Sequence, residues 1–199
     1  MRMGFVIYWL GYILVNLYLK IVHRWKVFGK KNVPKKGPLI VVSNHVSYLD
    51  PPIVGCAVNR HLYFMAKEEL FQKKWFGFIL RQIGTFPVKR GTPDKSAIRR
   101  SLKILKDGKV LCMFPEGTRM KGGKLGKAKP GVTLIALMSK SPILPVGIKH
   151  AEEDKPLRVS VGEPFSLEEY HDRKLSREEK EEVGELIMEK IKKQLESLD

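Results

Sequence analysis

One histidine and one carboxylate in this sequence have the types and spacing to act together as a base. His45 and Asp50 lie in the segment Asn-His-Val-Ser-Tyr-Leu-Asp at residues 44–50, which follows the apolar run at residues 39–42 after one serine. In a helix, side chains meet three or four positions apart, so a helix would separate this pair. In a loop that leaves a strand, Asp50 can fold back towards His45. A carboxylate bonded to one ring nitrogen stabilises imidazolium and leaves the other nitrogen free to take a proton from a hydroxyl.

The same two residues also have a purely structural interpretation. Pro51 follows Asp50 and suits the first turn of a helix, so Asp50 is predicted to be the N-cap of a helix that begins there. His45 would then bond only to backbone. A His–Asp pair alone does not decide between a base and a cap.

A second group of functional side chains follows another apolar run. Residues 114–119 read Phe-Pro-Glu-Gly-Thr-Arg. Gly117 permits a tight turn whose backbone N–H groups can face an anion, and the guanidinium of Arg119 suits a phosphate. Glu116 adds a carboxylate. Residues 121–131 carry four lysines and no acidic residue, which is typical of a solvated surface loop or of a lid over an anionic substrate.

Apolar runs rich in β-branched residues alternate with helical patterns along the chain, which favours an α/β fold: a single domain with a largely parallel, helix-flanked sheet. Pro145 predicts an edge position or a bulge for its strand, and Ser176 with Glu179 predicts a capping box. The strands are expected near residues 39–42, 62–66, 85–90, 109–114, 143–148 and 157–161, and the helices near 52–58, 67–83, 93–106, 132–138 and 176–195.

Ligands of open α/β sheets bind at the carboxyl ends of the strands. Four groups of polar or charged residues fall at such ends. They are the His45 loop, Lys67, the Lys89–Arg90 pair, and the turn at residues 116–119. Their convergence indicates one site that holds a base, an orienting acid and several cations.

The N-terminus has a different composition. Residues 3–19 contain no charged side chain, and basic residues follow without the small residues of a signal-peptide cleavage site. A run of 17 lies at the lower limit for crossing a bilayer. We therefore expect residues 1–36 to form a membrane-embedded helix with a basic juxtamembrane segment, and residues 37–199 to form the α/β domain on the cytoplasmic side of the membrane. The alternative is an apolar helix packed on its own domain.

Charge points to an anionic partner. The chain of 199 residues has a formal net charge of +16, with +22 in residues 1–149 and −6 in residues 150–199. Nucleic acid, an acidic membrane or a phosphate-bearing substrate would all suit such a body. Nucleic acid is disfavoured because no recognised binding motif is present and the apolar N-terminus would have no purpose. Cys56 and Cys112 show no metal-ligand spacing and are expected to be reduced core thiols.

Three ordered segments together resemble the glycerolipid acyltransferases, and most closely the 1-acyl-glycerol-3-phosphate acyltransferases. They are Asn44-His45 with Asp50, the Phe-Pro-Glu-Gly-Thr-Arg turn at residues 114–119, and residues 144–148, Leu-Pro-Val-Gly-Ile. Residues 84–90 occupy the place of the family's second motif. That motif usually has an acid directly before the arginine, whereas this sequence has Lys89 before Arg90.

The resemblance implies transfer of a fatty acyl group from acyl-CoA or acyl-carrier protein to the free hydroxyl of lysophosphatidic acid, without a metal or other cofactor. It implies that His45 is the base and Asp50 its partner. The acceptor would be held by cations and small groups, with Glu116 near its glycerol part. The substrate-binding candidates are Arg119, Gly117, Glu116, Thr118, Arg90 and Lys67.

Several alternatives remain open from the sequence. Glycerol-3-phosphate or a lysophospholipid with a larger head group could be the acceptor, and a membrane-binding protein with a degenerate site is a different class. The chain has no Gly-x-Ser-x-Gly segment that would supply a protein nucleophile, which favours direct attack by the acceptor hydroxyl.

Overall fold

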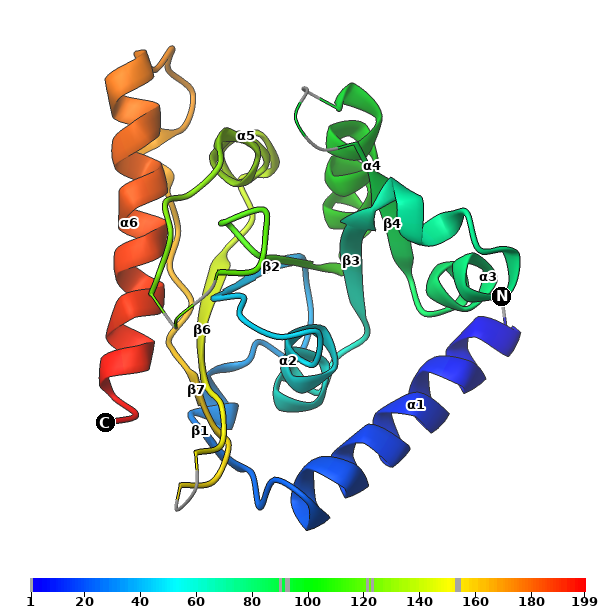
Figure 1. Cartoon of the computed structure of the whole chain (residues 1–199). Helices are drawn as coiled ribbons and strands as arrows, with labels where there is room; N and C mark the ends of the chain where they lie inside the picture. Colours follow the sequence, from blue (N-terminus) through cyan, green and yellow to red (C-terminus); the bar gives the residue numbers. More distant parts are fainter. Residues whose placement is uncertain (1, 90, 92–93, 121, 123, 153–154) are drawn as a thin grey trace.

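A single sheet organises the molecule in the computed structural model, which describes residues 2–89, 91, 94–120, 122, 124–152 and 155–199 (Figure 1). The strand order is β1-β7-β6-β2-β5-β3-β4. Every pair is parallel except β6 with β7, so the predicted, largely parallel sheet is confirmed. The strands are β1 Lys26–Phe28, β2 Leu39–Ser43, β3 Leu62–Lys67, β4 Thr85–Val88, β5 Val110–Met113, β6 Ile143–Lys149 and β7 Arg158–Val161.

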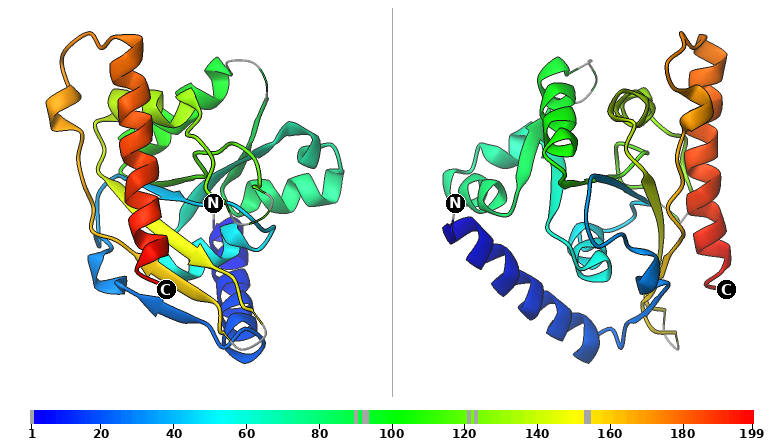
Figure 2. Two further views of the ribbon diagram at one scale, coloured as in Figure 1. Left: turned by 60° about the vertical axis from the view of Figure 1, so that its left-hand side comes forward. Right: turned by 180° about the vertical axis from the view of Figure 1, so that it is seen from behind.

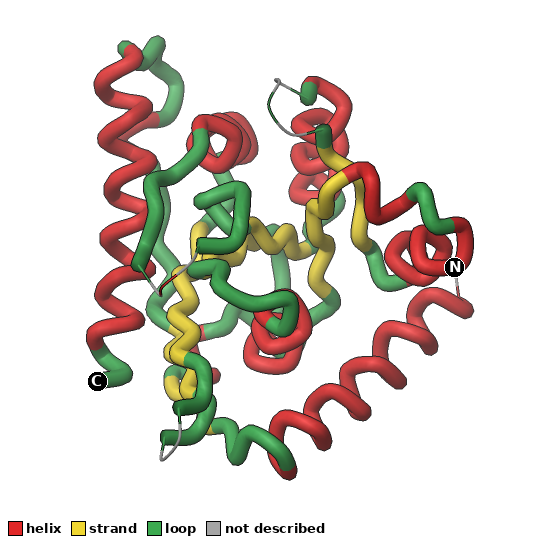
Figure 3. Tube along the Cα trace, in the orientation of Figure 1, coloured by secondary structure: helices red, strands yellow, loops and turns green. Residues whose placement is uncertain are grey.

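Helices connect most of these strands, and the alternation can be followed along the chain in Figure 3. The predicted capping box is present, because Ser176 Oγ accepts from Glu179 N and the Glu179 carboxylate accepts from Ser176 N. The helices are α1 Arg2–Ile21, α2 Asp50–Val58, α3 Lys74–Gln82, α4 Lys95–Lys106, α5 Pro130–Ser139 and α6 Arg177–Glu196, and the short 3-10 turns are η1 Lys30–Asn32, η2 Glu68–Phe71 and η4 Glu168–Tyr170.

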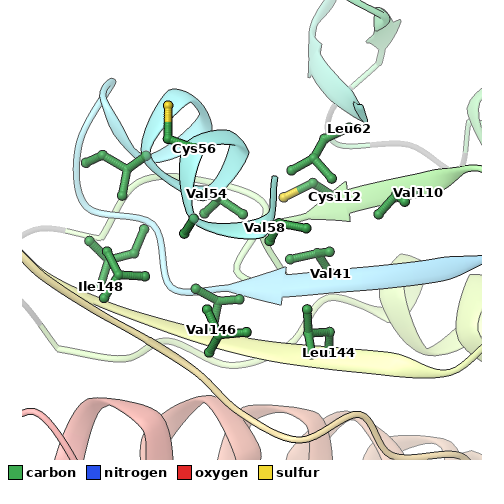
Figure 4. Close-up of a cluster of buried hydrophobic side chains, with 14 of the residues drawn as sticks. Val41, Val54, Cys56, Val58, Leu62, Val110, Cys112, Leu144, Val146 and Ile148 are labelled. Atoms are coloured by element: carbon green, nitrogen blue, oxygen red, sulfur yellow. The ribbon is translucent and has the colours of Figure 1, made fainter. Parts of the chain in front are cut away.

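Each face of the sheet is covered by its own set of helices (Figure 2). Leu39 and Val41 of β2 belong to the core cluster that includes α2, whereas Ile40 and Val42 belong to the cluster that includes α4, α5 and α6. This is why residues 39–42 form a continuous apolar run rather than an alternating one. Figure 4 shows Val41 facing α2, with α6 on the far side of the sheet. Both cysteines are buried and free, as expected.

Strand β6 fits only one of the two alternatives that were predicted from Pro145. Pro145 predicted an edge or a bulge, but β6 lies inside the sheet between β7 and β2. The edge prediction is wrong because the missing N–H of Pro145 falls where the antiparallel ladder with β7 changes register. Val146 pairs with Val161, and an unbroken ladder would pair Ile143 with residue 164, yet Ile143 bridges to Phe165. This one-residue offset has the register of a bulge.

Helix α3 also differs from expectation. The single helix predicted from residue 67 to residue 83 is divided into η2 and α3. Three large apolar side chains of α3 lie on the surface: Trp75 is 70% exposed, Phe78 49% and Ile79 40%. These three side chains therefore lie outside the core.

Helix α1 covers the outside of the domain and runs past α2 to α3 (Figure 1). Leu19 is buried, and the hydroxyl of Tyr8 accepts a hydrogen bond from the N–H of Leu62, so one side of α1 packs on the domain as the alternative interpretation had it. Its opposite side exposes Leu10, Leu14 and other apolar residues. Among the described residues, no helix has both the length and the apolarity needed to cross a bilayer.

Candidate active site

The structure brings His45 and Asp50 together. Strand β2 ends at Ser43, and the chain then forms a loop before α2 begins at Asp50. His45 Nδ1 lies 2.8 Å from Asp50 Oδ2, and the same oxygen accepts the backbone N–H groups of Val46 and Ser47, each at 2.7 Å. Asp50 is fully buried, whereas the His45 side chain is 14% exposed. The loop therefore wraps around a buried carboxylate and leaves the imidazole at the surface.

Asp50 is not the N-cap that the sequence predicted. It is the first residue of α2, and Leu49 occupies the cap position without a side-chain cap bond. The carboxylate of Asp50 faces back into the loop and bonds to N–H groups that precede it in the chain. These bonds outweigh the usual preference of a residue before proline for extended backbone.

The charge state of Asp50 assigns the protons on His45. Burial alone would raise the pKa of Asp50, but the hydrogen bonds from His150, His45, Ser47 and Val46 outweigh it and lower the pKa to about 2. An ionised carboxylate can only accept, so Nδ1 of His45 carries the hydrogen. In the neutral ring Nε2 is then an acceptor. No described residue hydrogen-bonds to this nitrogen. The ring therefore has the tautomer that a general base needs, and its acceptor nitrogen is free of described partners.

Three further contacts hold His45 in place. Its backbone N–H donates to Glu116 Oε2 at 2.8 Å, and its carbonyl accepts from Met120 N at 2.7 Å. The imidazole stacks on the ring of Phe114, with centroids 4.2 Å apart. All three partners come from the segment that follows β5, the strand next to β2 in the sheet. The two motifs found in the sequence thus form one rigid unit.

Glu116 is buried, with only 2% of its surface exposed. Oε2 bonds to His45 N, and Oε1 accepts from the backbone N–H of Gly126 at 2.9 Å. Burial raises the pKa of Glu116, and the bonds from Gly126 and His45 oppose that rise. Both carboxylate oxygens therefore accept backbone hydrogen bonds, one from the His45 loop and one from the lysine-rich segment.

Arg119 lies exposed at the rim of the site and contacts Tyr48. Its guanidinium carbon is 3.5 Å from the centroid of the Tyr48 ring, and Nη2 donates to the Tyr48 hydroxyl at 2.7 Å. Gly117 has φ of 68°, a left-handed conformation that glycine adopts at little cost, and its N–H donates to Phe114 O. That N–H is committed to the turn, and an anion-binding role for the other N–H groups of the turn stays a prediction. Thr118 is exposed beside Arg119.

Of the other two predicted phosphate ligands, Lys67 is among the described residues and Arg90 is not. Lys67 ends β3 at the same edge of the sheet and forms an ion pair with Glu69 at 2.8 Å, with its side chain 48% exposed. Arg90 lies outside the described residues. The lysine-rich segment contacts the site through Gly126, whose N–H bonds to Glu116.

His150 is a site residue that sequence reasoning missed. Its Nε2 lies 2.6 Å from Asp50 Oδ1, on the opposite oxygen from the one that His45 uses. The only signal available was its position, one residue after the end of β6, at the carboxyl edge where the other candidates gather. Nothing in the sequence states that β6 lies next to β2.

Together, the parallel sheet and the site define an α/β protein that can take a proton from a hydroxyl beside a cationic rim. Comparison with known proteins agrees with that class. A sequence profile of the Acyltransferase family matches residues 24–149, more than half of the chain. The chain therefore belongs to the acyltransferase family, and the resemblance seen in its motifs is confirmed.

Individual relatives are consistent with this assignment. The chain is 33% identical over 147 residues to the 1-acyl-sn-glycerol-3-phosphate acyltransferase of Bacillus subtilis, a match that covers 70% of this chain and 73% of that protein. It is 29% identical over 182 residues to the enzyme of the same name from Borreliella burgdorferi, covering 86% and 72%. The crystal structure of the 1-acyl-sn-glycerophosphate acyltransferase PlsC from Thermotoga maritima superposes with a TM-score of 0.70 at 25% identity, covering 92% of this chain and 78% of that one.

Proposed function

We propose that this acyltransferase moves a fatty acyl group from a thioester to the free hydroxyl of 1-acyl-glycerol-3-phosphate and so makes phosphatidic acid. The observation that carries the proposal is the His45–Asp50 pair, with Nε2 free of described partners, in a chain of this family. The names of the relatives support the choice of acceptor.

The residues present allow a direct transfer in which every atom is accounted for. Nε2 of His45 takes the proton of the acceptor hydroxyl while its oxygen attacks the thioester carbonyl carbon. The tetrahedral intermediate then collapses, the carbon–sulfur bond breaks, and the leaving thiolate takes the proton back from His45. Asp50 stabilises the imidazolium between these steps. General-base catalysis of this kind contributes about 10²- to 10⁴-fold in rate.

The acceptor phosphate would bind at the rim. Arg119 offers a planar fork of donors, and its exposed position lets it leave Tyr48 for a phosphate. Thr118, Lys67 and Arg90 remain candidates for the same role. For Glu116 we propose a positioning role rather than a contact with glycerol, because backbone N–H groups occupy both of its oxygens.

We further propose that the outer face of α1 rests on the cytoplasmic surface of the cell membrane, where both acyl chains of the reaction partition. Apart from Lys20 in the last turn, most of the described exposed side chains of α1 are apolar, and α3 adds Trp75 and Phe78. Basic residues after α1 would attract anionic lipid. The apolar residues exposed on and just after α1 are Val6, Leu10, Ile13, Leu14, Leu17, Ile21 and Val22.

An activity assay of the purified protein tests the reaction. Lysophosphatidic acid, glycerol-3-phosphate and lysophosphatidylcholine are each offered with acyl-CoA and with acyl-carrier protein. We expect phosphatidic acid from lysophosphatidic acid with at least one donor, and little transfer to lysophosphatidylcholine, whose phosphate is a diester. Preferential use of glycerol-3-phosphate or lysophosphatidylcholine would replace the proposed acceptor, and no transfer to any acceptor would support a non-catalytic membrane protein.

Liposome co-sedimentation tests the membrane face. Leu10→Glu combined with Leu14→Glu should release the protein from vesicles that contain anionic phospholipid, because both side chains are more than half exposed on the outer face of α1. Met138→Glu is the matched control, since Met138 is 57% exposed on α5. Unchanged binding of the double variant would refute the proposed contact.

A further inference from the structure

His150 is the one described side chain that reaches the free oxygen of Asp50. Its Nε2 lies 2.6 Å from Oδ1, although the two residues are 100 positions apart in the sequence. The carboxylate is fully buried and the His150 side chain is 30% exposed. The contact therefore forms between a fixed buried acceptor and a ring at the edge of the site.

The end of β6 is fixed against the His45 loop by a buried amide. Asn44 donates from its side-chain nitrogen to Ile148 O at 3.0 Å and accepts from Ile148 N at 2.9 Å. On the other side of β6, a side chain at Gly147 would lie within 2.8 Å of the backbone of Gln194, so the glycine lets α6 pack closely. These two contacts place His150 beside Asp50.

The two oxygens of Asp50 have unequal sets of donors. Oδ2 receives three hydrogen bonds, from His45, Val46 and Ser47, whereas Oδ1 receives one, from His150. Because an ionised carboxylate only accepts, His150 must hold its hydrogen on Nε2. Without this bond, the described residues would leave one oxygen of a buried anion unsatisfied, and the carboxylate could rotate away from His45.

We propose that His150 is a positioning residue for the acyl-transfer base: its Nε2–H holds Asp50 so that Oδ2 fixes the Nδ1–H tautomer of His45. The expected effect on kcat rests on the proposed function. The effect on the tautomer of His45 does not, and it can be measured without the reaction. The role requires an N–H donor at this position and does not require an imidazole. The other charged groups nearby are engaged elsewhere, since Lys149 pairs with Asp199 and Glu116 bonds to backbone.

Three variants test the proposal in the full-length protein. His150→Ala removes the donor, His150→Gln keeps an N–H at a similar reach, and Lys149→Ala is the control on the adjacent residue. We expect His150→Ala to lower kcat about 10- to 100-fold, the rate equivalent of one lost charge-assisted hydrogen bond, with KM for both substrates within about 2-fold. His150→Gln and Lys149→Ala should stay within about 3-fold of the unsubstituted protein in kcat.

Three kinetic results would overturn the proposal. If His150→Ala changed only KM, His150 would be a substrate ligand. If His150→Gln lost as much kcat as His150→Ala while melting normally, the imidazole itself would be needed. Retention of kcat by His150→Ala would leave no role for the contact.

A second readout does not depend on activity. Nitrogen NMR of the His45 ring reports which nitrogen is protonated. We expect the Nδ1–H form in the unsubstituted protein and in His150→Gln, and a mixture of tautomers in His150→Ala. If the protein proved inactive on every acceptor, the proposed function would fail while this measurement still decided the role of His150; an unchanged tautomer in His150→Ala would contradict it.

Discussion

Two regions of the site, the surroundings of His45 and the rim at Arg119, differ in burial and in hydrogen bonding. Around His45, the carboxylates of Asp50 and Glu116 are buried and every one of their oxygens accepts a hydrogen bond. At the rim, Arg119 and Tyr48 contact one another and are otherwise exposed. The difference suits two tasks. A base must be held in one geometry before the substrate arrives, whereas cations that bind a phosphate can rearrange around it.

The comparison predicts the largest effect at the buried centre. Asp50→Asn should lower kcat about 10²- to 10⁴-fold, because the amide carries no charge to stabilise imidazolium and places an NH₂ against N–H donors. Steady-state kinetics measures this effect. Asp172→Asn is the matched control: Asp172 is exposed, pairs with Lys140 and has φ of 58°, which asparagine tolerates. Equal activity of the two variants would remove the distinction between the regions.

Acid unfolding gives the next largest effect. The folded-state pKa of Asp50 lies near 2, below its ordinary value of 3.8, so its ionised form adds stability above about pH 4 that is lost as the pH falls towards 2. The shift corresponds to roughly 2 kcal/mol. Denaturant titrations at pH 5 and at pH 2 should therefore show the unfolding free energies of the unsubstituted protein and of Asp50→Asn converging at the lower pH. A constant difference would contradict the assignment.

The rim should respond through binding rather than turnover. Arg119→Ala is expected to raise KM for the acceptor about 10-fold, the cost of one exposed charge-assisted contact, with a smaller change in kcat. Arg177→Ala, which removes an exposed arginine on α6, is the control. A loss of kcat without a change in KM would place Arg119 with the base instead of the phosphate.

The smallest effect is expected at Tyr48. Tyr48→Phe removes the hydroxyl that accepts from Arg119 but keeps the ring on which the guanidinium stacks. Because exposed contacts of this kind contribute little, KM for the acceptor should change by about 3-fold or less. A change as large as that of Arg119→Ala would show that the rim, like the centre, is held in one geometry.

Much of the fold could be predicted from local patterns. Residues 39–42 predicted a strand covered on both faces because all four side chains are apolar, and β2 lies at the centre of the sheet. The capping box at Ser176 could also be predicted, because it depends on residues three positions apart. The predicted proximity of His45 and Asp50 needed only one short loop.

The contacts that could not be predicted from the sequence depend on the order of the strands in the sheet. His150 meets Asp50 because β6 lies beside β2, and no local pattern contains that neighbourhood. The same reason explains why the sequence left two alternatives for the strand of Pro145, an edge or a bulge: only the strand order shows that β6 lies inside the sheet. The resemblance implied that Glu116 lies near the glycerol part of the acceptor, and the burial of its carboxylate against two backbone N–H groups could not be read from the sequence.

His45 is the proposed base, and its contacts with Asp50, Glu116 and Phe114 hold the ring in one position. The direct test is the kcat of His45→Ala in acyl transfer to lysophosphatidic acid, measured beside its melting curve and its binding to liposomes. We expect kcat to fall about 10²- to 10⁴-fold, while melting and liposome binding stay close to those of the unsubstituted protein. Turnover within a few-fold of the unsubstituted protein would contradict the account.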